Sequence, residues 1–443
     1  MRTLWLALLL TIVWVAARSE QAPSSIYDRD PEHLWNRLYR AIVVRTEGAV
    51  DYGLDNAEPY YDAFDDPKKL AAILDEFLHK HGEGRARDDL RQALLQNDVW
   101  SAFDLATSPE VGASGVLLQR RLARVIERLQ LKSFQISSLP DNYAQAVKSA
   151  AFATDFDAEH PDRTFLPPDL LDPKGQWVEI GEAGLGAVAP FHVEMLSGRS
   201  VFRVFIRCPG GRQATLSYLE TLNLYPSPWA LNPQDIGTRS PDHAKVRLHP
   251  LLINPATPQF PPGTIVALVR QMMVINDELK PAPTSITEKV QFRVYKDTGE
   301  SGHISDRGDF SSRQLVYELV MRRRDLLAGR DGGLHSVTPN ETEYQLTSIP
   351  MGVSREAHLR GVVVLSTCVR CHSSNGIFSV NTYGQSLNGQ PLVADSVNSN
   401  PQLLPATSIG YQGNATADWK MRQLDWGLLR GLLEADVPSH RLH

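Results

Sequence analysis

Apolar residues at helical spacing dominate the first 160 residues of the chain. One such stretch begins at Asp66, a capping residue that is followed by Pro67, and ends at Gly82; its apolar face is formed by Leu70, Ile73, Leu74, Phe77 and Leu78. Three further stretches with the same period start near Leu34, Leu90 and Leu117. Residues 26–160 are therefore predicted to form a helical domain.

Short apolar runs separated by turns replace this pattern after a proline-rich stretch at 161–173, which is interpreted as a linker or a crossing loop. The runs predict strands at Val201–Ile206, Thr215–Leu219, Thr264–Val269, Val290–Tyr295 and Leu315–Met321. In Val290–Val294 apolar and polar residues alternate, which is typical of a strand with one solvent-exposed face. Residues 174–350 are expected to form a β-rich, sandwich-like domain.

Two features at the ends of these strands are assigned structural roles. Cys208 closes an apolar run and is expected to be a buried free thiol. The basic run Arg322–Arg324 is interpreted as a solvated strand end rather than a binding patch.

The N-terminus has the pattern of a secretory signal. Residues 1–17 contain one early arginine, an apolar run from Leu4 and a small-residue exit at Val15–Ala17, after which polar residues follow. The apolar run is short for a membrane span, although an uncleaved anchor is the alternative. The protein is thus expected to be exported, to the periplasm or the extracellular space, with no membrane span beyond this segment.

Composition excludes several classes of protein. With 42% hydrophobic and 22% charged residues, the 443-residue chain has an ordinary globular balance, long enough for two or three domains. A net charge of -6 gives no sign of a nucleic-acid partner. The chain has only three cysteines, so disulfides cannot provide its stability.

The motif with the most chemical content is Cys368-Val369-Arg370-Cys371-His372. Two thiols at this spacing reach both vinyl groups on one edge of a porphyrin, and the histidine that follows points at the iron from the same side. The pattern therefore predicts covalent attachment of one haem c through Cys368 and Cys371, with His372 as the proximal iron ligand. A disulfide, a redox dithiol and half of a zinc site are the alternatives.

These residues resemble the class c cytochromes. Gly361 and the apolar run after it are similar to the short helix that precedes many haem c motifs, and residues 417–434 resemble the helix that closes such domains. Two more stretches, residues 139–144 and 323–334, resemble exported bacterial proteins without an assigned function that end in a haem c motif. The resemblance implies a small α-helical cytochrome c-like domain at 351–443, and hence a multidomain α+β protein.

The sixth iron ligand is less clear from the sequence. Members of the family usually present a methionine from a loop, but the only methionine after the motif is Met421, within the expected closing helix. His358 is a second candidate, and a site left open or bound to water is the third. A thioether ligand would suit electron transfer, whereas an open site would permit small-ligand, peroxide or oxygen chemistry.

One-electron transfer by an exported mono-haem c protein is the function that these patterns favour, with an unidentified redox partner. A haem c enzyme or sensor with an open iron site is one alternative. The other is a secreted binding or structural protein whose two neighbouring cysteines form a disulfide. The sequence does not decide whether the protein is an enzyme.

Overall fold

The computed structural model describes residues 25–47, 50–52, 64–85, 88–109, 111–181, 184, 186–225, 229–231, 251–253, 257–296, 314–339, 341–344, 361–363, 365, 372, 376–380 and 403–435. The segment at 1–17 and three of the candidate site residues, Cys368, Cys371 and His358, lie outside the described residues.

The predicted helices of the N-terminal region are present. They are α2 (Leu34–Val43), α3 (Pro67–His79), α4 (Asp89–Thr107) and α5 (Ala113–Arg128), followed by the short helices α6 (Ser133–Ser138) and α7 (Asn142–Ser149). Asp66 caps α3 as expected, because its side chain accepts a hydrogen bond from the backbone nitrogen of Lys69. A 3-10 turn, η1 (Gly82–Arg85), follows α3, and a hairpin of β1 (Arg45–Glu47) and β2 (Val50–Tyr52) follows α2.

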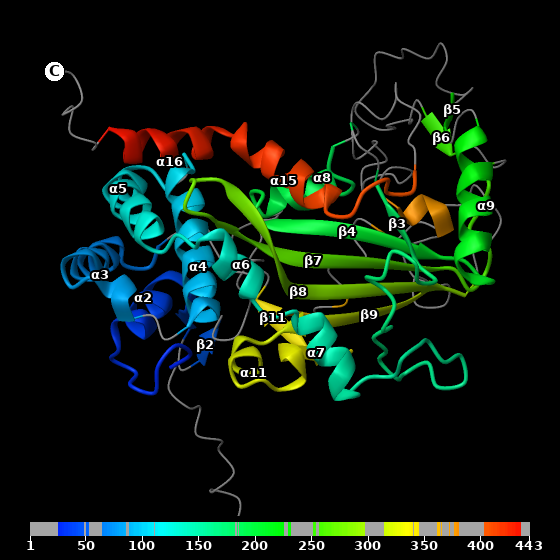
Figure 1. The fold of residues 1–443 in the computed structure, drawn as a ribbon, viewed down its shortest axis with the longest axis horizontal. Coiled ribbons are helices and arrows are strands. Elements are labelled where there is room, and N and C mark those ends of the chain that lie inside the picture. The colour runs from blue at the N-terminus through cyan, green and yellow to red at the C-terminus, as the bar shows by residue number, and fades with distance from the viewer. Residues whose placement is uncertain are drawn as a thin grey trace, which may run out of the picture.

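A six-stranded antiparallel sheet forms the centre of the molecule (Figure 1). Its order is β10-β9-β8-β7-β4-β3, formed by Leu334–Ser336, Gln314–Met321, Pro281–Tyr295, Ile265–Ile275, Ser200–Arg207 and Val178–Ile180. Four of the five predicted strands lie in it. The fifth prediction was wrong: Thr215–Leu219 belongs to helix α9 (Gly211–Leu224), where Thr215, Leu219 and Leu222 are buried at helical spacing.

The remaining elements are small. Strands β5 (Trp229–Leu231) and β6 (Leu251–Ile253) pair with each other, as do β11 (Thr342–Tyr344) and β12 (Gly361–Val363). Helices α8 (Pro190–Met195), α11 (Arg323–Leu327), α15 (Tyr411–Met421) and α16 (Leu424–Glu434) complete the described chain, with the 3-10 turns η2 (Asp331–Gly333) and η3 (Gly376–Ser379). Among the described residues one large sheet is present rather than two stacked ones, so the expected sandwich is not observed.

The two faces of the sheet differ in character, and strand β8 shows the difference. Val290, Phe292 and Val294 are buried on the face that packs against the main hydrophobic core. Gln291 and Arg293 point to the other face, where a solvent-exposed surface was predicted; both are in fact buried. The alternation therefore indicates the strand correctly, but its polar side faces other protein segments instead of water.

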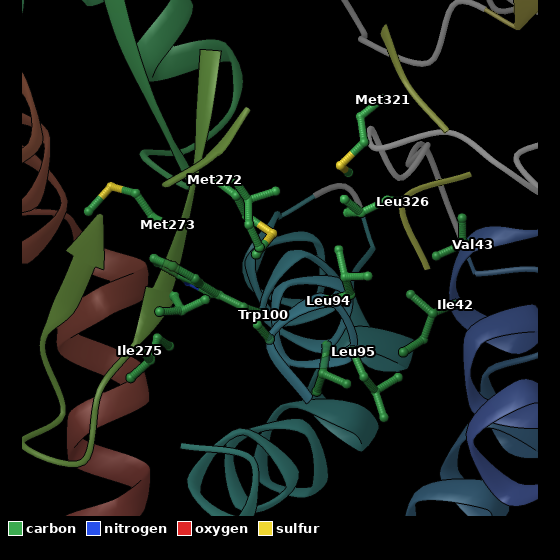
Figure 2. Packing of buried hydrophobic residues seen from close by; sticks show 14 of the residues in the cluster. Ile42, Val43, Leu94, Leu95, Trp100, Met272, Met273, Ile275, Met321 and Leu326 are labelled. Atoms are coloured by element: carbon green, nitrogen blue, oxygen red, sulfur yellow. The ribbon is translucent and has the colours of Figure 1, made fainter. Parts of the chain in front are cut away.

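One hydrophobic core joins the N-terminal helices to the sheet. Figure 2 shows Leu94, Leu95 and Trp100 of α4 among strand residues such as Met272 and Ile275. The side chain of Gln96 adds two hydrogen bonds of 2.7 Å to the backbone of Ile275. The predicted division between a helical domain at 26–160 and a β-rich domain at 174–350 is therefore not confirmed.

The C-terminal helices belong to the same core. The predicted single helix at 417–434 is two helices, α15 and α16, that meet at residues 422–423. Trp426 of α16 lies with its ring centroid 5.8 Å from that of Trp100, while α15 packs against β8 and β4. A separate cytochrome c-like domain at 351–443 is thus not confirmed within the described part of the chain.

The proline-rich stretch at 161–173 is a crossing loop rather than a flexible linker. Phe165, Leu166 and Leu170 are buried, and the Phe165 ring lies 4.5 Å from that of Phe292. The two stretches that resemble exported haem c proteins also meet in space, because Asn142 donates a hydrogen bond of 2.9 Å to the carbonyl of Gly332.

A buried ion pair connects α4 to the segment after β9. Both terminal nitrogens of Arg323 lie 2.5 Å from the carboxylate oxygens of Asp98, and the Tyr27 hydroxyl donates to the same carboxylate at 2.9 Å. Arg323 and Asp98 are 1% and 0% exposed. The interpretation of Arg322–Arg324 as a solvated strand end was therefore wrong for Arg323, because a carboxylate distant in sequence neutralises it in the core.

No helix in the described portion of the chain combines the length and apolar character needed to span a lipid bilayer.

Candidate functional site

His372 lies on the polar face of the sheet, beside the turn η3. Its Nδ1 is 2.6 Å from the carbonyl oxygen of Ser379. A carbonyl can only accept, so Nδ1 carries the proton and the other ring nitrogen, Nε2, presents a free electron pair. This is the state in which a histidine binds a metal through Nε2.

Tyr295, at the end of strand β8, anchors the turn that carries the Ser379 carbonyl. The hydroxyl of Ser379 donates to the carbonyl of Gly376 at 2.8 Å and therefore accepts from the hydroxyl of Tyr295 at 2.5 Å. Tyr295 and Ser379 are both buried. The orientation of the His372 ring is thus set by a chain of hydrogen bonds that starts in the sheet.

A second anchor holds the start of the same turn. The side-chain oxygen of Gln259 accepts a hydrogen bond of 2.6 Å from the backbone nitrogen of Ile377. Gly376 has a φ of +50°, and a Cβ at this position would lie 2.0 Å from that oxygen. The turn therefore requires glycine at position 376.

Arg293 of β8 is a buried cation beside His372. Its Nη1 lies 3.5 Å from the His372 carbonyl and 3.3 Å from Gln314, and its Nε lies 3.2 Å from Gln291. These acceptors are all neutral. Nη2 has no hydrogen-bond partner, and no carboxylate of the described residues forms an ion pair with Arg293, which is 6% exposed. A buried charge of this kind is costly unless an anion reaches it.

A second imidazole lies parallel to that of His372. It belongs to His192 in helix α8; the two ring centroids are 6.1 Å apart and the ring planes differ by only 4°. The aromatic ring of Phe202, on β4, lies 5.2 Å from the His192 ring. His192 is partly buried, and no hydrogen bond joins its ring nitrogens to another described residue.

Both histidines are neutral near pH 7. Burial, together with the positive charges of Arg293 and Lys289, lowers the pKa of His192 to about 4. Burial also lowers the pKa of His372 well below its usual value, together with Arg293 and His192, whereas the hydrogen bond to Ser379 acts in the opposite direction. Neutral imidazole is the form that binds metals.

The described residues contain no group of three or more His, Cys, Asp or Glu side chains that would hold a metal ion by themselves. A haem makes a different demand, since the porphyrin provides most of the iron ligands and the protein adds only the axial ones. One or two histidines are enough for that role.

The other predicted site residues have different positions. Met421, a predicted sixth ligand, ends α15 with 40% of its surface exposed. Cys208 is buried and free, as predicted, and its amide donates to the Thr215 hydroxyl at 2.8 Å. Burial raises the pKa of the Cys208 thiol, which leaves it unreactive.

Two residues of the site were missed in the sequence. His192 lies in a short helix without a recognisable motif, so only the fold brings it to His372. Arg293 did carry a signal, because it alternates with valine and phenylalanine in β8, but a polar residue in such a pattern is usually exposed.

No family model, no curated protein and no solved structure matches this chain, so its function is inferred from the chemistry of the site itself.

Proposed function

We propose that this chain is an exported mono-haem c protein that transfers single electrons. In this proposal Cys368 and Cys371 attach the haem covalently, and His372 is the proximal ligand of its iron. The signal pattern at 1–17 agrees with it, because haem c is attached after export, in the periplasm or outside the cell.

The observation that carries the proposal is the hydrogen bond from His372 Nδ1 to the Ser379 carbonyl. Histidines that bind metals commonly donate their other ring N–H to a backbone carbonyl or a carboxylate, which fixes the tautomer and the ring orientation. A histidine that only filled the core would not need to follow directly on a Cys-x-x-Cys pair. Here the sequence motif and the side-chain geometry, two independent observations, favour the same residue, His372, as the ligand.

Arg293 adds a test of whether the site fits this cofactor. Haem carries two carboxylate groups on its propionate chains, and Arg293 is a buried guanidinium with an unused Nη2. A propionate would provide the anion that the described residues do not, through a charge-assisted hydrogen bond. The cation beside His372 therefore fits haem better than it fits a zinc ion, which is itself positive.

When bound, the haem would supply an iron that accepts and releases one electron. The protein residues would tether it, orient His372 through Ser379 and shield the iron from water on the sheet side. No described residue is needed to move a proton or to attack a substrate, so electron transfer requires less of this site than catalysis does.

The first experiment is an absorption spectrum of the full chain expressed with a haem c maturation system. It would be recorded oxidised, reduced with dithionite, and after extraction with acid acetone. We expect a Soret band that resists extraction in the wild type and is absent from the Cys368→Ala/Cys371→Ala variant. Cys208→Ala is the matched control, since it removes the third cysteine and should retain the band.

The possible outcomes separate the alternatives. A wild-type protein without a Soret band, or with haem that extracts into acid acetone, would overturn the proposal and leave a secreted binding or structural protein with a disulfide. Covalent haem that is oxidised and reduced reversibly in a redox titration, and that a small soluble electron donor reduces rapidly, is the expected result.

A further inference from the structure

His192 is the candidate for the second axial position of the iron. It lies far from His372 in the sequence, but α8 and the turn η3 bring the two imidazoles together over the polar face of the sheet. Their planes are within 4° of parallel. Two neutral imidazoles brought together from separate elements can serve as ligands of one metal.

The separation of the two rings agrees with a shared metal. Imidazole nitrogens bind transition metals such as zinc at about 2.0–2.1 Å, and each nitrogen lies about 1.1 Å from the centre of its ring, so two such ligands on opposite sides have centroids roughly 6.3 Å apart. The observed separation is 6.1 Å. We propose that His192 is the sixth ligand and that the haem iron is bound by two histidines, an inference that rests on the proposed function.

The surroundings of His192 hold its ring in place and leave its nitrogens free. Pro190 begins the helix and Val193, next to His192, is completely buried, which fixes the backbone. Phe202 packs against the ring without using its polar atoms.

Met421 is a weaker candidate for the same position. Its side chain is 40% exposed at the end of α15, whereas an axial thioether is enclosed against the haem. The neighbouring Lys420 points into the core, where its ammonium group lies 3.0 Å from Asp104. Since Lys420 is fixed there, Met421 on the adjacent helical position faces outward.

Ligation by two histidines predicts spectroscopic properties that ligation by one does not. Six-coordinate iron with two imidazoles is low-spin and has no open position, so the reduced wild-type protein should not bind carbon monoxide. An imidazole in place of a thioether also gives a lower reduction potential.

The test compares wild type, His192→Ala, His192→Met and Met421→Leu by absorption and electron paramagnetic resonance, with carbon monoxide added to the reduced forms. We expect His192→Ala to become high-spin, to bind carbon monoxide, and to return to a low-spin spectrum when imidazole is added. His192→Met should keep six ligands with a raised midpoint potential. His160→Ala is the matched histidine control, because His160 is exposed and its ring pairs with the nearby Asp157.

Two results would overturn the assignment. One is a His192→Ala protein that retains its low-spin spectrum and excludes carbon monoxide; the other is a Met421→Leu protein that becomes high-spin. Either leaves the proposed function intact, since the haem is still covalently bound. Failure of the proposed function is recognised separately, by the absence of covalent haem from the wild type.

Discussion

The ion pair between Asp98 and Arg323 should stabilise the fold only as an intact unit. In the variant Asp98→Asn the guanidinium of Arg323 stays in the core without its counter-charge, and Tyr27 loses an ionised acceptor. Removal of one partner from a fully buried pair costs about 3–5 kcal/mol of unfolding free energy. Proteins are typically stable by about 5–15 kcal/mol, so the loss would be a large fraction of the total.

The assay is equilibrium urea denaturation of the mature protein, followed by tryptophan fluorescence and by far-ultraviolet circular dichroism. Glu434→Gln serves as the control, because the Arg430–Glu434 pair has the same chemistry but both side chains are more than half exposed. Its loss should cost less than about 1 kcal/mol. The triple variant Tyr27→Phe/Asp98→Leu/Arg323→Met should be close to the wild type or more stable, because no polar group is left without a partner.

The reasoning would be refuted if Asp98→Asn cost no more than Glu434→Gln, or if the triple variant were as unstable as the single one. The same curves test the architecture. One core across helices and sheet predicts that both probes report a single transition. Two separate transitions would restore the division into a helical and a β-rich domain.

Two further predictions concern the polar contacts around Asp104 and Tyr295. Burial raises the pKa of Asp104 to about 6, so the folded state holds this proton more tightly than the unfolded state, and its stabilising contribution is lost as the pH rises from about 4 through 6. Relative to Asp104→Asn, the wild type should lose about 3 kcal/mol over that range in urea titrations; a difference that does not change with pH would contradict this. Tyr295→Phe removes the hydrogen bond to Ser379 and should cost about 0.5–1.5 kcal/mol. A Tyr295→Phe protein as stable as the wild type would show that this contact does not support the turn behind His372.

The sequence predicted local structure best where a single periodicity decides the outcome. The helix from Pro67 is an example, since Asp66, the apolar stripe and Gly82 all specify the same element. Thr215–Leu219 was ambiguous because a short stretch with three apolar or aromatic residues out of five fits a strand or a buried helical face equally well, and the burial of Leu219 and Leu222 at helical spacing decides it.

The candidate site likewise contains one residue that a local motif predicts and others that only the fold brings together. His372 was predicted because covalent haem attachment imposes a fixed order on neighbouring residues. His192 and Arg293 have no such local constraint: they reach His372 only through the pairing of β4, β7 and β8 and the placement of α8. The role of Asp98 was hidden for a related reason, because its partner Arg323 lies in another part of the chain.

Because β8 places apolar side chains on one face of the sheet and polar side chains on the other, the protein can be engineered on one face at a time. Gln291 and Arg293 lie on the face near His372, whereas Val290, Phe292 and Val294 pack in the main hydrophobic core, so substitutions at positions 291 and 293 do not enter that core. A library restricted to these two positions would vary the charge and hydrogen bonding near His372 while the packing of the main core stayed constant. Under the proposed function, the strand thus offers a place to tune the reduction potential in small steps on an unchanged main core.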